Sequence, residues 1–424
     1  MMQTASSLLQ VLDTEAPVRT VTGTIARRND ITVTVEGDLA ALAREWREFE
    51  QRADGTVFQS FAWLSAWRRH IGVLKDVHPA IVVGRDADGR IAILLPLATQ
   101  AGRFARELVW FGSDLCDYNA PLLAPDFTER FGAAALERLW PQICASLGAD
   151  PQWQFDLIRL EKMPETIGRQ PNPLLFLPHS RHPSGAWLTP LAESWDAFYA
   201  AKRSSTTRRR DRTKRKKLAA LGEISLTEPV EPARRVKCVN TLMEQKARSL
   251  ARMGVSNLFE RPGHAAFYRA LASDPELASL VHISELSVAG NPVALNVGLT
   301  FQRRYYHLLA SHTDEQDVAR FGPGTAHLNE LLALAIRRGF AIFDFTIGDE
   351  PYKRDWCETR QMLYDHLDGA TARGSLIVPA LAVKQRVKRL IKENAMLWAA
   401  FSKLRSDAAR LLGKHPTVSS EVET

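Results

Sequence analysis

One order of elements is predicted twice along the 424 residues of this chain: helix, three strands, helix and strand. Strands are predicted where apolar residues alternate between turn residues, and helices where they recur every three or four residues. The first copy comprises strands at 31–36, 80–84, 90–99, 107–111 and 154–160 and helices at 38–52, after Ser60, and at 127–147. The second comprises helices at 194–220, 232–253, 262–272 and after Gly324, and strands at 281–288, 292–301, 304–311 and 341–346. This repeat predicts an α/β (α+β) fold of two similar domains, each a mostly antiparallel mixed sheet flanked by helices.

The domain boundaries follow from where the repeated order starts and stops. Residues 1–29 show no sustained periodicity and are interpreted as a flexible leader. The first lobe is placed at 30–190, where it ends in an irregular connection, and the second lobe at 191–376. Residues 377–424 carry apolar side chains at helical spacing among lysines and arginines, which predicts a basic amphipathic helix and tail.

Composition excludes several classes of protein. A hydrophobic content of 45% and a charged content of 24% are typical of soluble globular proteins. No stretch reaches the roughly 18 apolar residues of a membrane span, and the N-terminus does not resemble a signal peptide, so we expect a cytoplasmic protein. The four cysteines are scattered without metal-ligand spacing, so we expect reduced thiols and no metal site.

Positive charge is concentrated in two segments, Lys202–Lys217 and 384–414. Their combined charge exceeds the +7 of the whole chain, so the remainder is acidic overall. The first segment fits a solvated helix face, a surface for an anionic acceptor such as a sugar nucleotide or lipid headgroup, or a tRNA-binding surface. The second fits a helix that packs on the protein or one that contacts a membrane surface or a partner.

The second copy differs from the first where its third strand meets the next helix. Gly322, Pro323 and Gly324 form a compact turn before Thr325, whereas the first copy has GSDLCDYNAPLLAPDF at this place. Glycine permits tight turns and close approach of a ligand to the backbone, and the first N–H groups of a helix favour an anion. We therefore expect a phosphate-bearing ligand beside Arg320, Gly322, Gly324 and Thr325, and a first lobe without this loop.

Several segments together resemble one family. They are FQSFAWLSAWRRH, the arginine-rich helix near 208–217, LSVAGNPVALNVGL with YYHLLASH, GPGTAHLNELLALAIRRGF and FDFTIGDEPYKRDW. Over roughly residues 30–380 the chain resembles the CelD-type acetyltransferases of the GNAT superfamily. These bacterial proteins are often linked to cellulose or exopolysaccharide production and are distant relatives of the Fem peptidoglycan aminoacyltransferases. The resemblance implies two tandem GNAT-like domains and an N-acyltransferase with acetyl-CoA or another acyl-CoA as donor.

Acyl transfer from such a donor needs sites for its phosphates and its thioester. The resemblance assigns the donor pyrophosphate to the N–H groups around Gly322–Thr325 and the thioester oxygen to a backbone N–H within 306–311. Alternation along that strand places His307 and His312 on opposite faces, so one of them is expected to face the ligand. We expect His312 to belong to the donor site, although a lone strand histidine also fits a structural role.

Acyl transfer also needs a base for the attacking amine and an acid for the leaving thiolate. Asp344, which alternation places on one face with Thr346, is one candidate base. Asp349 and Glu350, which follow Gly348 at the end of the strand, are the others. Tyr352 is the candidate acid, and Lys353 is a candidate ligand for a phosphate or carboxylate. Structural roles fit each of them equally: a turn cap or arginine pair for Asp344, loop solvation for Asp349, core packing for Tyr352 and an ion pair with Asp349 for Lys353.

Three functions remain open from the sequence. The first is acyl transfer from acyl-CoA to an amine or hydroxyl of a polysaccharide precursor or related anionic metabolite. The second is aminoacyl transfer from tRNA, which Lys202–Lys217 would bind. The third is a non-catalytic accessory protein of a polysaccharide synthase, docked through the C-terminal helix.

Overall fold

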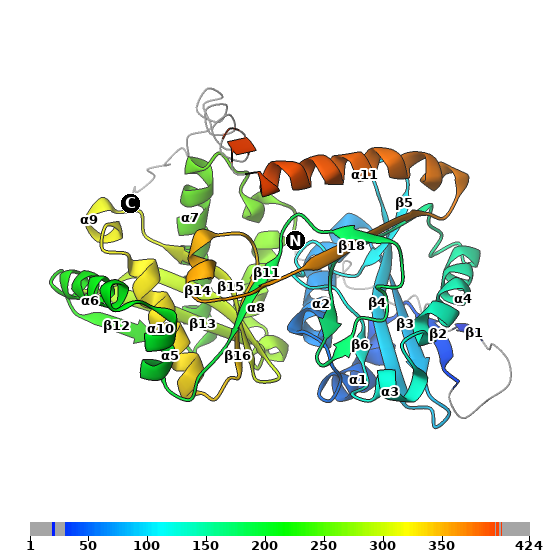
Figure 1. Ribbon diagram of the computed structural model, residues 1–424, viewed down its shortest axis with the longest axis horizontal. Coiled ribbons are helices and arrows are strands. Elements are labelled where there is room, and N and C mark those ends of the chain that lie inside the picture. Colours follow the sequence, from blue (N-terminus) through cyan, green and yellow to red (C-terminus); the bar gives the residue numbers. More distant parts are fainter. Residues whose placement is uncertain (1–18, 22–29, 395, 398–399, 401–424) are drawn as a thin grey trace, which may run out of the picture. The chain divides into compact units, whose positions relative to one another are not determined.

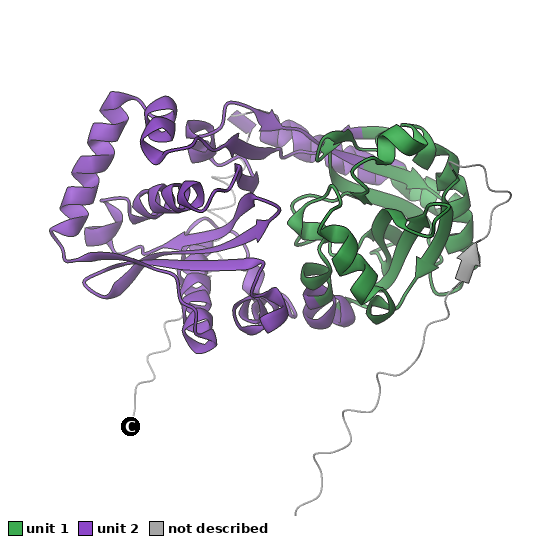
Figure 2. Ribbon diagram, turned by 90° about the horizontal axis from the view of Figure 1, so that it is seen from below, with its two compact units in different colours: residues 1–65, 75–179, 366–378 green, residues 66–74, 180–365, 379–424 purple. Residues whose placement is uncertain are grey.

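Figure 1 shows the computed structural model, which describes residues 19–21, 30–394, 396, 397 and 400. Two compact units divide the chain, and Figure 2 colours them separately. Unit 1 consists of the described residues up to Ser65, Lys75–His179 and His366–Val378. Unit 2 consists of Ala66–Leu74, Ser180–Asp365 and the described residues from Pro379 onward. The chain therefore returns to unit 1 after unit 2, whereas the sequence predicted two consecutive lobes that meet at 190/191.

Unit 1 is built on one sheet. Its strands follow the order β1-β2-β3-β4-β5-β7-β18-β10, with β6 paired to β4. Its strand bounds are β1 Arg19–Val21, β2 Thr32–Glu36, β3 His78–Arg85, β4 Ile91–Ala101, β5 Arg106–Trp110, β6 Leu122–Leu123, β7 Leu157–Pro164, β10 His179–Arg181 and β18 Leu363–Gly369. Its helices are α1 Leu39–Glu50, α2 Phe61–Trp67, α3 Phe127–Phe131 and α4 Ala135–Ala149, and β8 Thr166–Ile167 with β9 Gln170–Pro171 forms a small hairpin. The pairs β3–β4 and β4–β5 are antiparallel and β5–β7 is parallel, which is the predicted order.

Unit 2 repeats this arrangement. Its sheet has the order β12-β13-β14-β15-β16-β11-β17, antiparallel except where β15 meets β16. Its strands are β11 Ala186–Pro190, β12 Ile224–Thr227, β13 Val281–Val288, β14 Asn291–Phe301, β15 Arg304–His312, β16 Ile342–Ile347 and β17 Arg360–Gln361. Its helices are α5 Trp195–Lys202, α6 Ser205–Ala219, α7 Pro232–Arg252, α8 His264–Ser273, α9 Gln316–Ala319 and α10 Pro323–Arg337. The two sheets flanked by helices confirm the predicted fold class.

Helices α7 and α10 cover opposite faces of the unit 2 sheet. Neighbouring residues Ser311 and His312 of β15 point to opposite faces. The Ser311 hydroxyl donates to Gln245 Oε1 of α7 at 2.8 Å, whereas His312 packs against Gly324 of α10. The α10 face buries a cluster that includes Leu331, Leu332, Phe343 and Phe345. Helix α7 therefore covers one face of the sheet and α10 the other.

Two predicted helices are interrupted, each for a local reason. The helix predicted at 194–220 is two helices, because Ser204 adopts an extended conformation and its hydroxyl accepts from the Thr207 N–H at 3.2 Å. The helix predicted at 127–147 breaks at Gly132, whose φ of 81° belongs to the left-handed region.

The two ends of the chain bear on two further predictions. Most of the predicted leader lies outside the described residues, and within it Arg19–Val21 pairs with Val33–Val35. The predicted C-terminal helix is present as α11, Ala372–Glu393, with Arg389 and Lys392 donating hydrogen bonds to Arg181 and Ser184. The tail from residue 401 lies outside the described residues. Among the helices that are described, none combines the length and the apolar character that crossing a bilayer requires.

Candidate functional site

Strands β15 and β16 separate partway along their length. They pair in parallel only at Arg304–Ile342, Tyr305–Phe343 and Tyr306–Asp344, although β15 continues to His312. Beyond this point β15 and β16 no longer pair with each other, although β15 still pairs with β14 and β16 with β11. This separation is the place in unit 2 where a ligand could reach main-chain donors within a sheet.

Each strand carries a bulge where the separation begins. The span from Tyr306 to Leu309 lies opposite Val297–Leu299, so β15 contains one additional residue at His307–Leu308. On β16, the partners of Trp187 and Leu188 are Thr346 and Asp344, so Phe345 is the additional residue. Thr346 has a φ of 59°, which is rare for a β-branched side chain. Such bulges redirect side chains, so the strict alternation predicted for His307 with His312 and for Asp344 with Thr346 does not hold.

The first turn of α10 lies at the end of β15. Gly322 precedes it with φ 66° and ψ 55°, and Pro323 is its first residue. A Cβ built on Gly324 would come within 3.2 Å of His312 Cδ2, so His312 and this turn are in contact. The N–H groups of Gly324 and Thr325 have no acceptor within the helix, and Thr325 is exposed. The structure thus brings the predicted residues Gly322, Gly324, Thr325 and His312 together.

Arg320 lies beside this turn rather than over it. Its guanidinium pairs with Asp317 at 3.3 Å and stacks 4.8 Å from the centre of the Phe321 ring. The side chains of both ion-pair partners are more than half exposed, so this pair holds Arg320 only weakly.

Lys353 closes the loop that follows β16. Its ammonium donates to the carbonyl oxygens of Thr346 at 3.3 Å and Ile347 at 3.0 Å, and it pairs with Glu350 Oε2 at 3.0 Å. Lys353 is 3% exposed, so its three donors are satisfied inside the protein. Gly348 allows this approach, because a Cβ there would come within 2.9 Å of the Lys353 ammonium. The predicted pair of Lys353 with Asp349 is not formed, since Asp349 pairs with Arg360 at 2.9 Å.

Four side chains near the point where β15 and β16 separate influence one another's charge states. They are His307, Lys246, Glu350 and Lys353. Burial lowers the pKa of His307 to about 3, and the positive charges of Lys353 and Lys246 act in the same direction. Burial also lowers the pKa of Lys246, whose ammonium donates to the Ala310 carbonyl at 3.4 Å, while the charge of Glu350 opposes that shift. Burial acts to raise the pKa of Glu350, but the adjacent Lys353 outweighs it, so the net pKa is lowered. At neutral pH this cluster contains an ionised carboxylate and a neutral imidazole.

Asp344 and Tyr352 differ in how deeply they are buried and in what they contact. Asp344 is fully buried, accepts from the Thr346 N–H at 2.8 Å and pairs with Arg304 at 3.5 Å. Its carboxylate therefore supports the bulge of β16. Tyr352 is 39% exposed and packs edge-on to Phe345, with ring centres 6.1 Å apart. Burial and the neighbouring Glu350 charge raise the pKa of Tyr352, so its phenol keeps its proton.

Sequence patterns did not identify every member of this cluster. Lys246 lies in a helix of ordinary amphipathic spacing, and nothing in that spacing marks it as close to β15. Strand β11, which pairs with β16, lies in a segment that was interpreted as an irregular connection. Glu350, by contrast, was a candidate from the sequence together with Asp349, because both follow Gly348 at the end of a strand.

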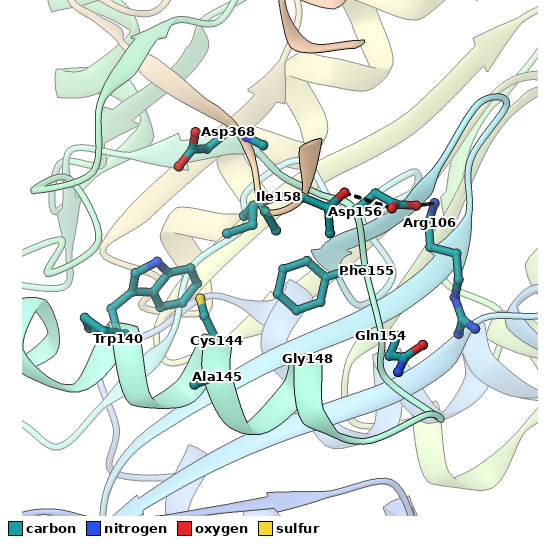
Figure 3. A pocket seen from close by; sticks show the side chains of 14 residues that line it. Arg106, Trp140, Cys144, Ala145, Gly148, Gln154, Phe155, Asp156, Ile158 and Asp368 are labelled. Carbon is teal, nitrogen blue, oxygen red and sulfur yellow. Dashed lines mark hydrogen bonds between the residues drawn. The ribbon is translucent and has the colours of Figure 1, made fainter. Parts of the chain in front are cut away.

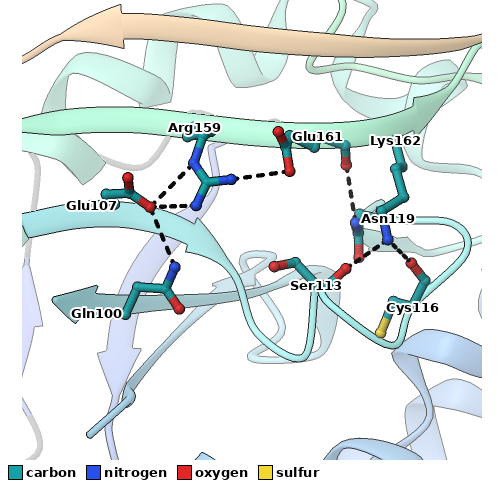
Figure 4. Close-up of polar contacts among 8 residues, drawn as sticks. All are labelled: Gln100, Glu107, Ser113, Cys116, Asn119, Arg159, Glu161 and Lys162. Atoms are coloured by element: carbon teal, nitrogen blue, oxygen red, sulfur yellow. Dashed lines mark hydrogen bonds and ion pairs between the residues drawn. The ribbon is translucent and has the colours of Figure 1, made fainter. Parts of the chain in front are cut away.

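Unit 1 fills the corresponding place with its own chain. After β5, the loop 111–119 is tied to β7: the Lys162 ammonium donates to the carbonyls of Ser113 at 2.7 Å and Cys116 at 2.6 Å (Figure 4). The Asn119 side chain donates to the Glu161 carbonyl at 3.0 Å. No helix begins at this loop, and Cys116 and Asn119 are buried. In unit 1 the chain that follows β5 is therefore tied to the edge of β7 by these hydrogen bonds.

A cavity of unit 1 lies elsewhere, between α4, β7 and residues 368–371. It encloses about 680 Å³, and Figure 3 shows Trp140, Cys144, Phe155 and Ile158 lining it. The Asp156 carboxylate accepts from the Arg106 N–H at 3.1 Å and the Thr371 hydroxyl at 3.0 Å. Burial raises the pKa of Cys144 to about 12, so it is a thiol rather than a nucleophilic thiolate. Cys144 therefore gives this cavity no activated nucleophile.

No group of histidine, cysteine, aspartate or glutamate that could hold a metal ion occurs among the described residues. All four cysteines are free thiols.

Comparisons with known proteins agree with this geometry. Residues 205–354, all in unit 2, match the family model described as an acetyltransferase (GNAT) domain. The structure of FemX is similar to this chain, with a TM-score of 0.54 and 9% identity over 79% of this chain and 97% of that one. A conserved protein of unknown function from Bacteroides thetaiotaomicron VPI-5482 is similar with a TM-score of 0.50 and 12% identity over 78% and 98%. At these identities the two structures support the fold alone, and no curated protein sequence matches the chain. The family match confirms the predicted acyltransferase, and the matched residues 205–354 include the separated strands and the glycine turn of unit 2.

Proposed function

We propose that this protein transfers an acyl group from acetyl-CoA or another acyl-CoA to an amine or hydroxyl acceptor, using unit 2. The observation that carries the proposal is the separation of β15 and β16 with the first turn of α10 at its end. It offers main-chain donors for a thioester on β15 and an anion site for phosphates at the start of α10. The CelD-type resemblance extends the proposal to a cytoplasmic enzyme of cellulose or exopolysaccharide biosynthesis that acts on a saccharide precursor.

The donor would bind along the end of β15. The free N–H groups of Gly324 and Thr325 favour the pyrophosphate, and glycine at 324 leaves room for it beside His312. The bulge at His307–Leu308 leaves a backbone N–H out of the ladder with β14, which suits the thioester oxygen as negative charge develops on it. Arg320 and His312 would contribute side-chain contacts at the edge of this site.

Glu350 and Tyr352 supply the proton transfers. The acceptor amine attacks the thioester carbon, a C–N bond forms and its proton passes to the Glu350 carboxylate, directly or through water. The C–S bond then breaks, and the Tyr352 phenol protonates the leaving thiolate. The lowered pKa of Glu350 and the raised pKa of Tyr352 set these protonation states before reaction. Asp349, paired with Arg360, is the second candidate base.

Asp344 and Lys353 act as positioning residues in this scheme. Asp344 fixes the bulge of β16 through the Thr346 N–H, and Lys353 ties the loop that carries Glu350 to the end of the same strand. Both side chains are almost fully buried, which suits support of the site better than contact with a diffusing substrate.

Aminoacyl transfer from tRNA is the alternative that one observation favours. The fold is similar to that of FemX, and Arg209, Arg210 and Lys217 of α6 are exposed on unit 2. A non-catalytic role beside a polysaccharide synthase is supported only by the exposed apolar residues of α11, such as Leu376 and Leu390.

A thermal-shift screen with acetyl-CoA, longer acyl-CoAs and CoA, followed by a thiol-release assay, tests the proposal. A ligand that binds only the folded state raises the unfolding temperature by mass action. We expect a shift with acyl-CoA in the wild type and none in Gly324→Trp, whose side chain fills the anion site. Gly148→Trp, at an exposed helix position with open space around it, is the matched control and keeps the shift. The absence of a shift with every thioester at millimolar concentration would sink the acyl-CoA proposal.

A further inference from the structure

The lysine and arginine side chains on one face of α6 line a groove beside the first turn of α10. The groove encloses about 570 Å³ and is lined by Thr206, Arg209, Arg210, Thr213, Lys214, Lys217, Arg320 and Phe321. The α6 members recur at spacings of three and four residues, so they form one stripe along the helix. Figure 1 shows α6 next to α10 within unit 2.

The cations of this stripe have no acidic partner among the described residues. The one acidic residue of α6, Asp211, accepts a hydrogen bond from the Tyr199 hydroxyl at 2.7 Å and lies 3.9 Å from the Arg203 guanidinium. Arg215, which is not in the stripe, pairs with Glu330 at 2.7 Å. Beside the groove, the exposed Asp317 pairs with Arg320. An uncompensated row of cations in a concave surface favours a ligand with several negative charges.

The groove is continuous with the anion site at α10. Lys214 lines this groove and also the adjoining cavity, of about 330 Å³, that contains Gly322 and Thr325. Its ammonium lies 3.7 Å from a Cβ built on Gly322. The Phe321 ring also lines both cavities. A ligand whose pyrophosphate lies at the α10 turn could therefore place a further charged group against the α6 stripe.

We propose that the α6 stripe binds the 3′-phosphorylated nucleotide end of the donor and so selects CoA over donors that lack this phosphate. The inference rests on the proposed function, because it takes acyl-CoA as the donor. Acyl-CoA carries a pyrophosphate and a separate ribose phosphate next to a purine. Arginine and lysine suit the phosphates, and the Phe321 ring offers a surface against which the base can stack.

The groove favours a small nucleotide over tRNA as its ligand. Its cations are gathered in one pocket beside the glycine turn, and an aromatic ring lies among them. A tRNA would require phosphate contacts spread over a longer surface, with a steep dependence of affinity on salt.

The test compares acetyl-CoA with 3′-dephospho-acetyl-CoA, the same donor without the phosphate that the stripe would bind. Dissociation constants are measured for the wild type, Lys217→Gln and Lys216→Gln. The two variants change adjacent exposed residues by the same charge, but only Lys217 lines the groove. We expect the wild type to prefer acetyl-CoA by roughly tenfold or more, because a charge-assisted contact is lost with the phosphate. Lys217→Gln should remove most of that preference and leave the dephospho donor unaffected, while Lys216→Gln retains it.

Equal affinity of the wild type for both donors would overturn this inference and leave the proposed function intact. If Lys217→Gln and Lys216→Gln reduced the preference for acetyl-CoA equally, the inference would be overturned as well. The loss of one positive charge would then explain the effect, whichever residue carried it. Binding of neither donor would overturn the proposed function first. Binding of tRNA that acetyl-CoA does not displace, and that Lys217→Gln weakens, would assign the stripe to nucleic acid instead.

Discussion

The His312 ring lies directly against Gly324, so that a Cβ at residue 324 would approach His312 Cδ2 to 3.2 Å. This contact joins the last residue of β15 to the first turn of α10. A side chain at 324 must displace either the histidine or whatever occupies the space above the turn. Glycine is therefore favoured here by close approach to His312 rather than by its φ angle, which is not in the left-handed region.

Replacement of Gly324 by valine should weaken acetyl-CoA binding by about tenfold or more, because the branched side chain occupies the anion site. The dissociation constant from competition binding measures this. In the double variant Gly324→Val with His312→Ala, the smaller residue at 312 makes room for the valine, but the valine still blocks the phosphates. The double variant should therefore recover unfolding free energy without recovering affinity for acetyl-CoA. Unchanged affinity in Gly324→Val would contradict the placement of the donor phosphates.

Replacement of Glu350 by glutamine should lower kcat by about 10²–10⁴-fold, because the amide cannot accept the amine proton. Donor affinity should stay within about twofold, since the proposal places Glu350 at the reacting end of the donor and away from its phosphates. Steady-state thiol release, with the acceptor that supports the fastest turnover, gives both values. Glu358→Gln removes an exposed carboxylate of the same segment and serves as the control. Comparable turnover in the two variants would assign the base elsewhere, with Asp349 next.

The buried His307 should make unit 2 sensitive to acid. Its pKa is lowered to about 3 by burial, so between about pH 6.5 and 3 the unfolded chain binds a proton that the folded protein does not. Stability contributed by the neutral imidazole is therefore complete above pH 6.5 and falls as the pH decreases. At pH 5 the loss is about 2 kcal/mol for this residue.

Urea denaturation at pH 7 and pH 5 measures this difference. His307→Gln should lose less unfolding free energy between the two pH values than the wild type does. His312→Gln changes an exposed histidine of the same strand and should behave as the wild type. An identical acid sensitivity in His307→Gln and the wild type would show that the imidazole is not held neutral.

Replacement of Lys353 by methionine should lower the unfolding free energy by about 2–4 kcal/mol. The carbonyls of Thr346 and Ile347 would lose their donor while buried, and Glu350 would lose its counter-charge. Chemical denaturation measures this, with Lys216→Met as a surface control of the same chemical change. A loss below about 0.5 kcal/mol would mean that the loop after β16 is held by other contacts.

Local patterns predicted the repeated sheets, the helices and the glycine turn because each depends on residues close together in sequence. Asp38 accepts from the Ala40 N–H and starts α1 where periodicity placed it. The bulges at His307–Leu308 and Phe345 were not predictable in this way, since they are defined by register against β14 and β11. The same limit explains why Lys246 and β11 were missed. Their positions depend on tertiary contacts that no spacing rule contains.

The candidate site was predicted in part. The glycine turn and His312 come together as expected, because chain connectivity forces the end of β15 to meet α10. Asp344, Asp349, Tyr352 and Lys353 have different surroundings from one another, although the sequence presented them as one polar group. Burial and ion-pair partners separate them, and both depend on how β16 bends at Thr346.

Calorimetric titration of the full chain with acetyl-CoA tests the central claim most directly. The account predicts one binding site per chain, in unit 2, that Gly324→Trp abolishes and Gly148→Trp retains. Absence of binding to the wild type, or binding that Gly324→Trp leaves unchanged, would contradict the assignment of the α10 turn and the separated strands as the donor site.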